Sequence, residues 1–311
     1  MISLFRNFKD IKNHTNKSIV AIGNFDGLHH GHKAIVNQAK LLKRKYGGKF
    51  IILTFHPHPL KVLRPGNEPK NILSFRNKVI KMRELGVDML LAQRFNIAFS
   101  KLTPLDFIQK VLIDGLNVSD IIIGDDFHFG YKRQGNVDYL MSAEFRKHFN
   151  VHIINEVSGK TGRYSSSLAR DMIASGKMME VKEVLGYFYE VEGHVVKGEQ
   201  LGNTLGFPTA NINYLNTVIP EDGIYAGWVK IKDKFHMGAI STGYRPQFKG
   251  KKRFLEAHLL NFSGDIYGTR IKVSLVKKIR DEQVFSDIEE LKKQMTLDCK
   301  KAINILTENN I

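Results

Sequence analysis

The chain has 311 residues, of which 42% are hydrophobic and 25% are charged, and this length favours two domains over one. No secretion signal follows Met1 and no apolar run reaches the roughly 18 residues of a membrane span, so we expect a soluble, cytoplasmic protein without a membrane partner. The net charge of +16 is concentrated before residue 187, where there are 29 Lys and Arg and 16 Asp and Glu. This excess indicates either a polyanionic partner or basic side chains on solvated helix faces.

In the first half of the chain, short apolar runs alternate with stretches of helical periodicity. Nearly continuous apolar strands separated by helices are typical of a parallel sheet covered on both faces, so we predict a Rossmann-like α/β domain. The strands are expected at 18–22, 50–55, 89–93, 120–124 and 151–154, and the helices at Lys33–Tyr46, Ser74–Leu85, Pro104–Leu112 and Asp138–His148.

The first of these strands runs into a glycine-punctuated loop with three histidines, VAIGNFDGLHHGH (20–32). The next helix should begin near Gly31, which places His29 and His32 about one turn apart at its N-terminus. Backbone amides and the helix dipole make such an end an anion site, and two imidazoles there would stabilise charge on a phosphoryl group in transfer. A zinc site and ordinary surface histidines are the alternatives.

After a helical stretch that ends near Leu185, strands separated by turn signals replace the strand–helix alternation. Period-2 strands without intervening helices suggest a small antiparallel β-barrel, so the predicted domains are 1–186 and 187–311. The strands are expected at 189–196, 209–214, 223–231, 235–242, 254–262 and 269–279.

A closing helix from Ser286 to Leu306 follows these strands and should cover the barrel. Its covering positions are expected to be Ile288, Leu291, Met295 and Leu297. The single cysteine, Cys299, lies in this helix. It excludes an intramolecular disulfide framework, makes a poor metal site alone, and is expected to be inert.

Seven short motifs add specificity to this pattern. The first half contains GNFDGLHHGH (23–32), TFHPHP (54–59), GDDFHFG (124–130) and SSSLAR (165–170), and the second contains LGFPTANI (205–212), EAHLLNF (256–262) and DIYG (265–268). In this order they resemble the bacterial bifunctional riboflavin kinase/FAD synthetases, over nearly the whole chain. Several motifs in the right order are more specific than any one alone.

The resemblance implies two reactions. Riboflavin and ATP would give FMN, and FMN and a second ATP would give FAD and pyrophosphate. The expected substrates are therefore ATP, riboflavin and FMN, with Mg²⁺ as the cofactor and no nucleic-acid partner.

For adenylyl transfer, the resemblance implies that His29 and His32 bracket the α-phosphate of ATP. The phosphate of FMN is already anionic, so positioning and charge neutralisation suffice without a base. Further nucleotide contacts are expected from Gly23, Asn24, Phe25, Gly31, Ser166, Ser167 and Arg170. Flavin contacts are expected from Pro57, Pro59, Asp126, Phe127 and Phe129, and core packing is the alternative for both phenylalanines.

For riboflavin phosphorylation, a hydroxyl must lose its proton to a base. Glu256, in an apolar strand, is the expected base, and a solvent-facing strand residue is the alternative. Thr209 and Asn211 share one strand face and are expected to bind Mg²⁺ together with ATP phosphates. Nucleotide contacts are also expected from Gly198, Gly202 and Gly206, and a flavin contact from Arg280.

Four positions depart from the family's usual pattern: His56, Ala169, Gln247 and Asn261. Two of them lie near the expected flavin end of the kinase half, so a chain that makes FAD but has lost riboflavin phosphorylation is the runner-up hypothesis. A basic protein that binds nucleic acid and responds to flavin is a third hypothesis, although no nucleic-acid-binding motif supports it.

Overall fold

The computed structural model describes residues 2–198, 206–244 and 253–310. Contacts divide the chain into two compact units. One comprises Met1–Pro69 with Phe75–Tyr164, and the other comprises Lys70–Ser74 with Ser165–Ile311.

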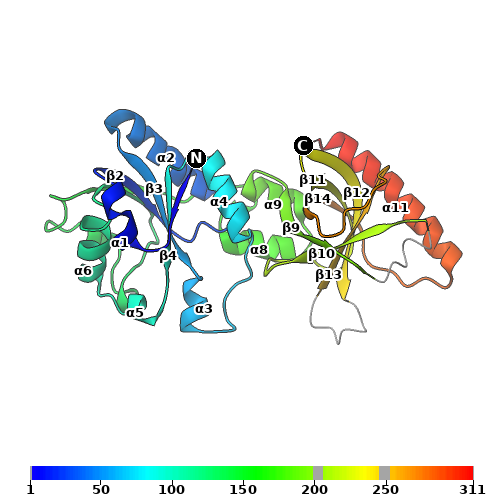
Figure 1. Cartoon of the computed structure of the whole chain (residues 1–311), viewed down its shortest axis with the longest axis horizontal. Helices are drawn as coiled ribbons and strands as arrows, with labels where there is room; N and C mark the ends of the chain where they lie inside the picture. Colours follow the sequence, from blue (N-terminus) through cyan, green and yellow to red (C-terminus); the bar gives the residue numbers. More distant parts are fainter. Residues whose placement is uncertain (1, 199–205, 245–252, 311) are drawn as a thin grey trace. The chain divides into compact units, whose positions relative to one another are not determined.

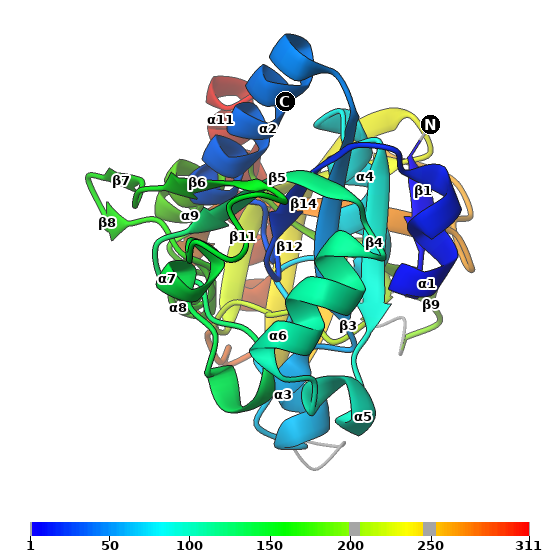
Figure 2. The same cartoon turned by 90° about the vertical axis from the view of Figure 1, so that its left-hand side faces the viewer.

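The first unit is built on a six-stranded parallel sheet in the order β1-β4-β3-β2-β5-β6, and Figure 2 shows β6 and β1 at its opposite edges. β2 is buried along its whole length and β3 along most of it, which is why their sequences are continuous apolar runs. The predicted Rossmann-like domain is confirmed. Its strands are β1 (Ser3–Phe5), β2 (Ser18–Ile22), β3 (Lys49–His56), β4 (Met89–Arg94), β5 (Val118–Gly124) and β6 (Asn150–Ile154).

Helices cover both faces of this sheet. In Figure 1, α1 (Phe8–Ile11) and α6 (Pro104–Asp106) lie on one face, and α2 (His30–Tyr46) and α4 (Phe75–Glu84) lie on the other. α2 buries an apolar stripe at helical spacing, and its C-cap residue is Gly47, whose φ of 72° favours glycine. Shorter elements are α3 (Pro59–Leu63), α5 (Ile97–Ser100), the π-helix η2 (Phe107–Ile113), α7 (Val137–Leu140) and the hairpin strands β7 (Ser158–Gly159) and β8 (Gly162–Arg163).

The expected helix at Asp138–His148 is wrong beyond its first turn. α7 ends at Leu140, and the chain continues in turns to residue 149. The carbonyl of Met141, which would accept from residue 145 in a helix, instead accepts from Nε of Arg146 at 2.8 Å, while the Phe145 amide donates to the Ser142 carbonyl at 3.1 Å. The edge strand β1 was not predicted.

The second unit contains a closed antiparallel barrel in the order β10-β13-β12-β11-β14-β9, as the sequence predicts. Two short helices precede the barrel, and the long helix α11 packs along β11, β12 and β14 (Figure 1). The elements are α8 (Ser166–Ala174), α9 (Met178–Leu185), β9 (Tyr189–Val196), β10 (Thr209–Tyr214), β11 (Gly223–Ile231), β12 (Lys234–Tyr244), β13 (Arg253–Leu259), β14 (Arg270–Arg280) and α11 (Ile288–Glu308).

The buried face of α11 differs in part from the predicted one. Leu291 and Met295 are half-buried and Ile288 and Leu297 are exposed, whereas Asp298, Ala302 and Leu306 are buried. The two faces differ because the observed buried face contains a carboxylate, which an apolar pattern does not predict. Asp298 binds an arginine of the barrel and so faces inward. Cys299 is half-buried, and burial together with Asp298 raises the pKa of its thiol to about 11, which keeps it protonated.

Candidate active sites

The histidine loop ends at the start of α2. His29 is the N-cap residue, with an extended backbone and no side-chain capping bond, and α2 begins at His30. The rings of His29 and His32 stack with centroids 3.8 Å apart and planes 28° from parallel. The structure therefore brings the two predicted catalytic histidines together at the positive end of a 17-residue helix.

Two neighbours hold this pair. Phe25 is fully buried with a φ of 49°, and its ring centroid lies 4.9 Å from that of His32, so its side chain supports the histidine and only its backbone can face a nucleotide. A Cβ on Gly31 would lie 3.1 Å from the ring of His29, so a larger residue there would press on the histidine. A Cβ on Gly23 would lie 3.3 Å from the ring of Phe25.

The protonation of His32 is governed by its surroundings. Burial is the main cause that lowers the pKa of His32 well below its usual value, and positive charge on His29 and Lys78 lowers it further. The imidazole is therefore neutral near pH 7. Its Nδ1 is buried and has no hydrogen-bond partner among the residues that the structure describes, so the ring keeps hydrogen-bonding capacity for a ligand.

Asn24 connects the histidine loop to the TFHPHP segment. Its carbonyl accepts from Nζ of Lys78 at 2.9 Å and from Oγ1 of Thr54 at 3.1 Å, and its side-chain nitrogen lies 3.4 Å from Nε2 of His58. His58 caps α3 by accepting from the amide of Leu60, and Pro59 is the first residue of that helix. Pro57 follows a cis peptide bond. Lys78 was not identified from the sequence.

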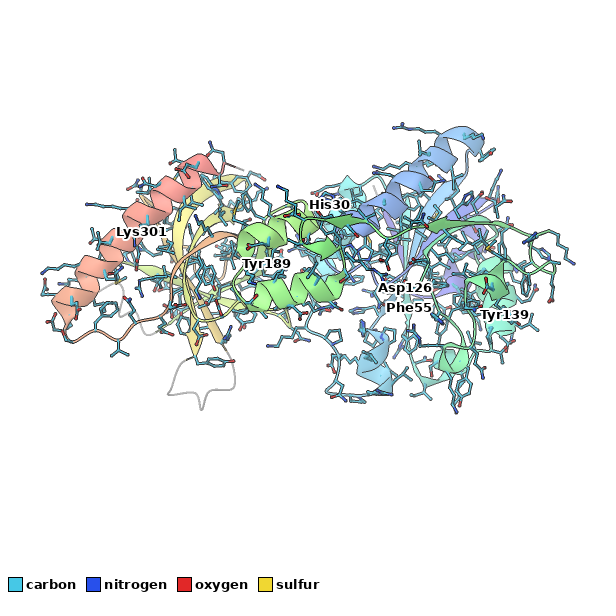
Figure 3. The ribbon with its side chains drawn as sticks, turned by 180° about the vertical axis from the view of Figure 1, so that it is seen from behind. His30, Phe55, Asp126, Tyr139, Tyr189 and Lys301 are labelled. Atoms are coloured by element: carbon cyan, nitrogen blue, oxygen red, sulfur yellow. The ribbon has the colours of Figure 1, made fainter. Side chains whose placement is uncertain are left out.

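A pocket of about 420 Å³ lies beside the N-terminus of α2. His30, Lys33, Ala34 and Asn37 line it from one face of the helix, and Val157 and Tyr164 line it from the segment around the β7–β8 hairpin. Figure 3 labels His30 at the start of α2, and its ring centroid lies 5.6 Å from that of Tyr164. Sequence reasoning missed this pocket because its two walls are more than a hundred residues apart.

The loop after β5 carries the predicted flavin contacts of the first unit. The carboxylate of Asp126, labelled in Figure 3, is exposed and pairs with Arg163 at 2.9 Å. Phe129 is buried in the core of the first unit, and the partly buried Phe127 stacks on it with centroids 5.6 Å apart. Of the two phenylalanines, Phe129 serves the core and Phe127 lies nearer the surface.

The SSSLAR motif forms the start of α8. Ser165 is the N-cap and its hydroxyl accepts from the amide of Leu168, so Ser166 and Ser167 occupy the first turn, at the positive helix end. Nε of Arg170 donates to the Lys70 carbonyl at 2.9 Å. α8 belongs to the second contact unit, whereas the histidine loop belongs to the first.

The predicted kinase residues gather on the outer face of the barrel. In the β10–β13 pairing Asn211 lies opposite Glu256, and Oγ1 of Thr209 donates to the Glu256 carboxylate at 3.4 Å. All three side chains are half-buried, while Ala210 and Ala257 between them are buried in the barrel. The alternation of the strands thus places three of the predicted polar groups side by side.

A close approach of the backbone flanks this group. A Cβ on Gly198 would lie 2.1 Å from the side-chain nitrogen of Asn211, so a larger residue there would displace the Asn211 side chain. Gly206 has a φ of 85°. Asn261 also takes a left-handed φ, of 55°, which Asn tolerates well. Gly202 and Gln247 lie outside the described residues.

Arg280 lies at the end of β14 and contacts α11. Its Nε and Nη2 donate to the Asp298 carboxylate at distances of 2.8–3.1 Å, and both side chains are largely buried. The guanidinium group is therefore engaged within the protein, and its predicted contact with flavin stays a prediction.

Comparison with known proteins decides the family. A family model described as FAD synthetase matches residues 11–168, and one described as riboflavin kinase matches residues 185–306. A bifunctional riboflavin kinase/FMN adenylyltransferase of Buchnera aphidicola is 34% identical over 302 residues, covering 96% of each chain. The chain belongs to the bifunctional riboflavin kinase/FMN adenylyltransferase family.

A second relative has the same description, and one solved structure with a different description has a similar fold. The Escherichia coli protein of the same description is 36% identical over 281 residues, covering 90% of each chain. A crystal structure described as a macrolide-efflux protein of Streptococcus pneumoniae has a TM-score of 0.87 and 29% identity, and covers 100% of this chain and 99% of its own. Among the described residues, no helix is both long and apolar enough to cross a membrane.

Both enzymatic domains of the family are present in this chain, so the bifunctional hypothesis holds over that of a chain that makes FAD alone. Within the described ranges, no cluster of three or more His, Cys, Asp or Glu side chains is arranged to hold a metal ion.

Proposed function

We propose that adenylyl transfer to FMN takes place at the histidine loop and that riboflavin phosphorylation takes place at Glu256 on the barrel. The observation that carries the first assignment is the stacked pair His29–His32 at the N-terminus of α2. Stacked imidazoles, backbone amides and a helix dipole converge there, a combination suited to the negative charge that grows on the α-phosphate.

The adenylyl step needs no base, because the phosphate of FMN is already ionised. His29 and His32 would stabilise the α-phosphate, and the loop backbone at Gly23, Asn24, Phe25 and Gly31 would surround it. Ser166, Ser167 and Arg170 would bind the outgoing pyrophosphate, since arginine's planar fork matches phosphate oxygens and the first turn of α8 offers backbone amides.

The pocket beside α2 would receive the adenine base. It adjoins the helix end that carries the histidines, and it combines apolar Ala34 and Val157 with the Tyr164 ring and the Asn37 amide. Such a mixture of stacking surface and amide groups suits a purine. The flavin ring would contact Pro57, Pro59, Asp126 and Phe127, with Phe129 supporting Phe127 from the core.

The kinase step requires proton removal from a hydroxyl of riboflavin. Glu256 would accept this proton. The side-chain oxygens of Thr209 and Asn211 are the kind of ligand atom that Mg²⁺ prefers. Two such ligands fit an ion that arrives with ATP, because magnesium binds few protein ligands and keeps phosphate oxygens and water. Bound Mg²⁺ would neutralise phosphate charge during transfer. Gly198 and Gly206 would let the backbone approach the phosphates, and Arg280 would contribute on the flavin side.

A time course tests both assignments together. The purified protein is incubated with riboflavin, ATP and Mg²⁺, and the flavins are separated at intervals; we expect FMN and then FAD. In His29→Ala and His32→Ala variants, FAD formation should fall about one hundredfold or more, the scale of a lost transition-state donor, while FMN still accumulates. Loss of both products in a folded variant would contradict the assignment of two separate sites.

We also propose that the protein acts in the cytoplasm. Both proposed reactions consume ATP. Fractionation of cells that express the chain would test this location.

A further inference from the structure

Lys78 lies in the second turn of α4 and reaches the histidine loop. Its Nζ donates to the carbonyl of Asn24 at 2.9 Å, and the same carbonyl accepts from Oγ1 of Thr54 at 3.1 Å. A charge-assisted bond and a neutral bond from two different elements therefore fix one peptide group at the start of the loop.

The position of this peptide group affects where the two histidine side chains lie. The next residue, Phe25, is fully buried with a φ of 49°, and Leu28 has a φ of 44°. Such backbone conformations leave the loop little freedom to adjust locally. Because the Phe25 ring packs on His32 and His32 stacks on His29, a shift at Asn24 would displace both imidazoles.

The charge of Lys78 acts on two histidines. After burial, the main cause, His29 and Lys78 lower the pKa of His32. Burial also lowers the pKa of His56, followed by Arg6, Lys78 and Lys61. Lys78 is the cation common to both histidines.

We propose that Lys78 is a positioning residue for adenylyl transfer: by donating to the Asn24 carbonyl, its ammonium group holds the loop in the geometry in which His29 and His32 can meet the α-phosphate. The inference rests on the proposed function of that loop. Misplacement of catalytic groups by about 1 Å can lower a rate about a hundredfold, so loss of the bond from Lys78 to Asn24 should lower the rate of FAD formation measurably.

The experiment compares Lys78→Met, which keeps the length of the side chain but removes the donor and the charge, with Lys78→Arg, which keeps both. Arg83→Met, at an exposed position of the same helix, is the matched control for loss of one positive charge. FAD formation from supplied FMN is measured at saturating ATP, and riboflavin phosphorylation in the same preparations reports on intact protein.

We expect Lys78→Met to lower kcat for FAD formation at least about tenfold, with riboflavin phosphorylation unchanged, because the lost bond is charge-assisted. Lys78→Arg should recover most of the rate, and Arg83→Met should match the wild type. NMR titration of labelled histidines should show a higher pKa for His32 in Lys78→Met, because a nearby positive charge is gone. A general loss of folding would lower both activities, whereas loss of this anchor should lower FAD formation alone.

Wild-type kcat in Lys78→Met, or an equal loss in Arg83→Met, would overturn the inference. If Lys78→Met does not fold, Lys78→Gln removes the charge and shortens the side chain with a polar group in place, and a wild-type kcat in that variant would also overturn the inference. His29→Ala separates the two proposals. If that variant keeps FAD formation, the assigned site itself is wrong; if it loses FAD formation while Lys78→Met does not, only the positioning role fails.

Discussion

At the residue scale, burial and a bound nucleotide should shift the pKa of His32 in opposite directions. The buried ring is neutral near pH 7, because burial and positive neighbours lower its pKa. A bound triphosphate would favour the protonated form. Nucleotide binding should therefore draw a proton to this site, which couples binding to pH.

The lowered pKa of His32 predicts how the stability of the protein changes with pH, and this can be tested without substrate. Because protonation is easier in the unfolded chain than in the fold, the stability of the protein should fall as the pH drops through about 6.5, the unfolded value, toward the lower folded value. In His32→Asn this loss should be smaller. Thermal unfolding of both proteins between pH 7.5 and 5 measures it, and equal slopes would show that His32 does not titrate as described.

Glu256 allows proton transfer to be separated from binding. Glu256→Gln keeps size and hydrogen-bonding reach but removes the basicity, so riboflavin and ATP should bind about as before while phosphorylation slows by roughly two to four orders of magnitude. FAD synthesis from supplied FMN should continue. Wild-type phosphorylation at saturating substrate would assign the base to another carboxylate.

At the element scale, one buried ion pair connects α11 to the barrel. Asp298 occupies the middle of the inward face of α11, and its carboxylate accepts from two nitrogens of Arg280. A Gln294 amide donates to the same carboxylate at 2.9 Å. Removing one partner of such a pair leaves a buried charge without its counterion, which is more costly than replacing both.

Substitution of the pair should therefore be non-additive. Asp298→Ala should destabilise the kinase unit by about 3–5 kcal/mol, whereas Arg280→Met combined with Asp298→Leu should recover much of that loss. Denaturant unfolding measures the stabilities. The riboflavin KM of the double variant then separates the roles of Arg280: an unchanged KM would limit Arg280 to anchoring α11, and a raised KM would support its predicted flavin contact.

At the scale of the whole molecule, the contact units and the predicted domains divide the chain at different places. The predicted boundary lies at 186/187, whereas contacts assign Ser165–Ile311 and Lys70–Ser74 to the barrel unit. α9 contacts β9 and β14, and a Cβ on Gly176, in the turn between α8 and α9, would lie 2.8 Å from the hydroxyl of Tyr225. α9 and the turn before it thus pack on the barrel, and α8 packs on α9.

Excised fragments should show this contribution. A fragment of residues 187–311 should phosphorylate riboflavin, but it should unfold at a lower denaturant concentration than a fragment of residues 165–311. The longer fragment keeps Val181, Val184 and Leu185, which are buried, and each such side chain contributes about 1.5–3 kcal/mol. Equal midpoints would mean that α8 and α9 add nothing to the barrel, and an insoluble longer fragment would contradict its independence.

The sequence by itself determined the fold class and the local elements that carry chemistry. Strands buried on both faces must be apolar throughout, so the parallel sheet was readable from runs such as 18–22, and the alternation in 209–214 and 254–262 predicted the half-buried strands of the barrel. The histidine loop, Thr209, Asn211 and Glu256 were identified from short motifs and from the family resemblance that those motifs carry, because each motif spans only a few neighbouring residues.

Only the tertiary structure decided which distant residues complete the sites. Lys78 contacts Asn24, 54 positions earlier in the chain. Asn37 and Tyr164 line the same pocket beside α2. Asp298 faces inward because it pairs with Arg280 on another element. None of these residues has a periodic signal of its own. Their roles arise from contacts between elements, and the free energy of such contacts depends on packing that local propensity does not encode.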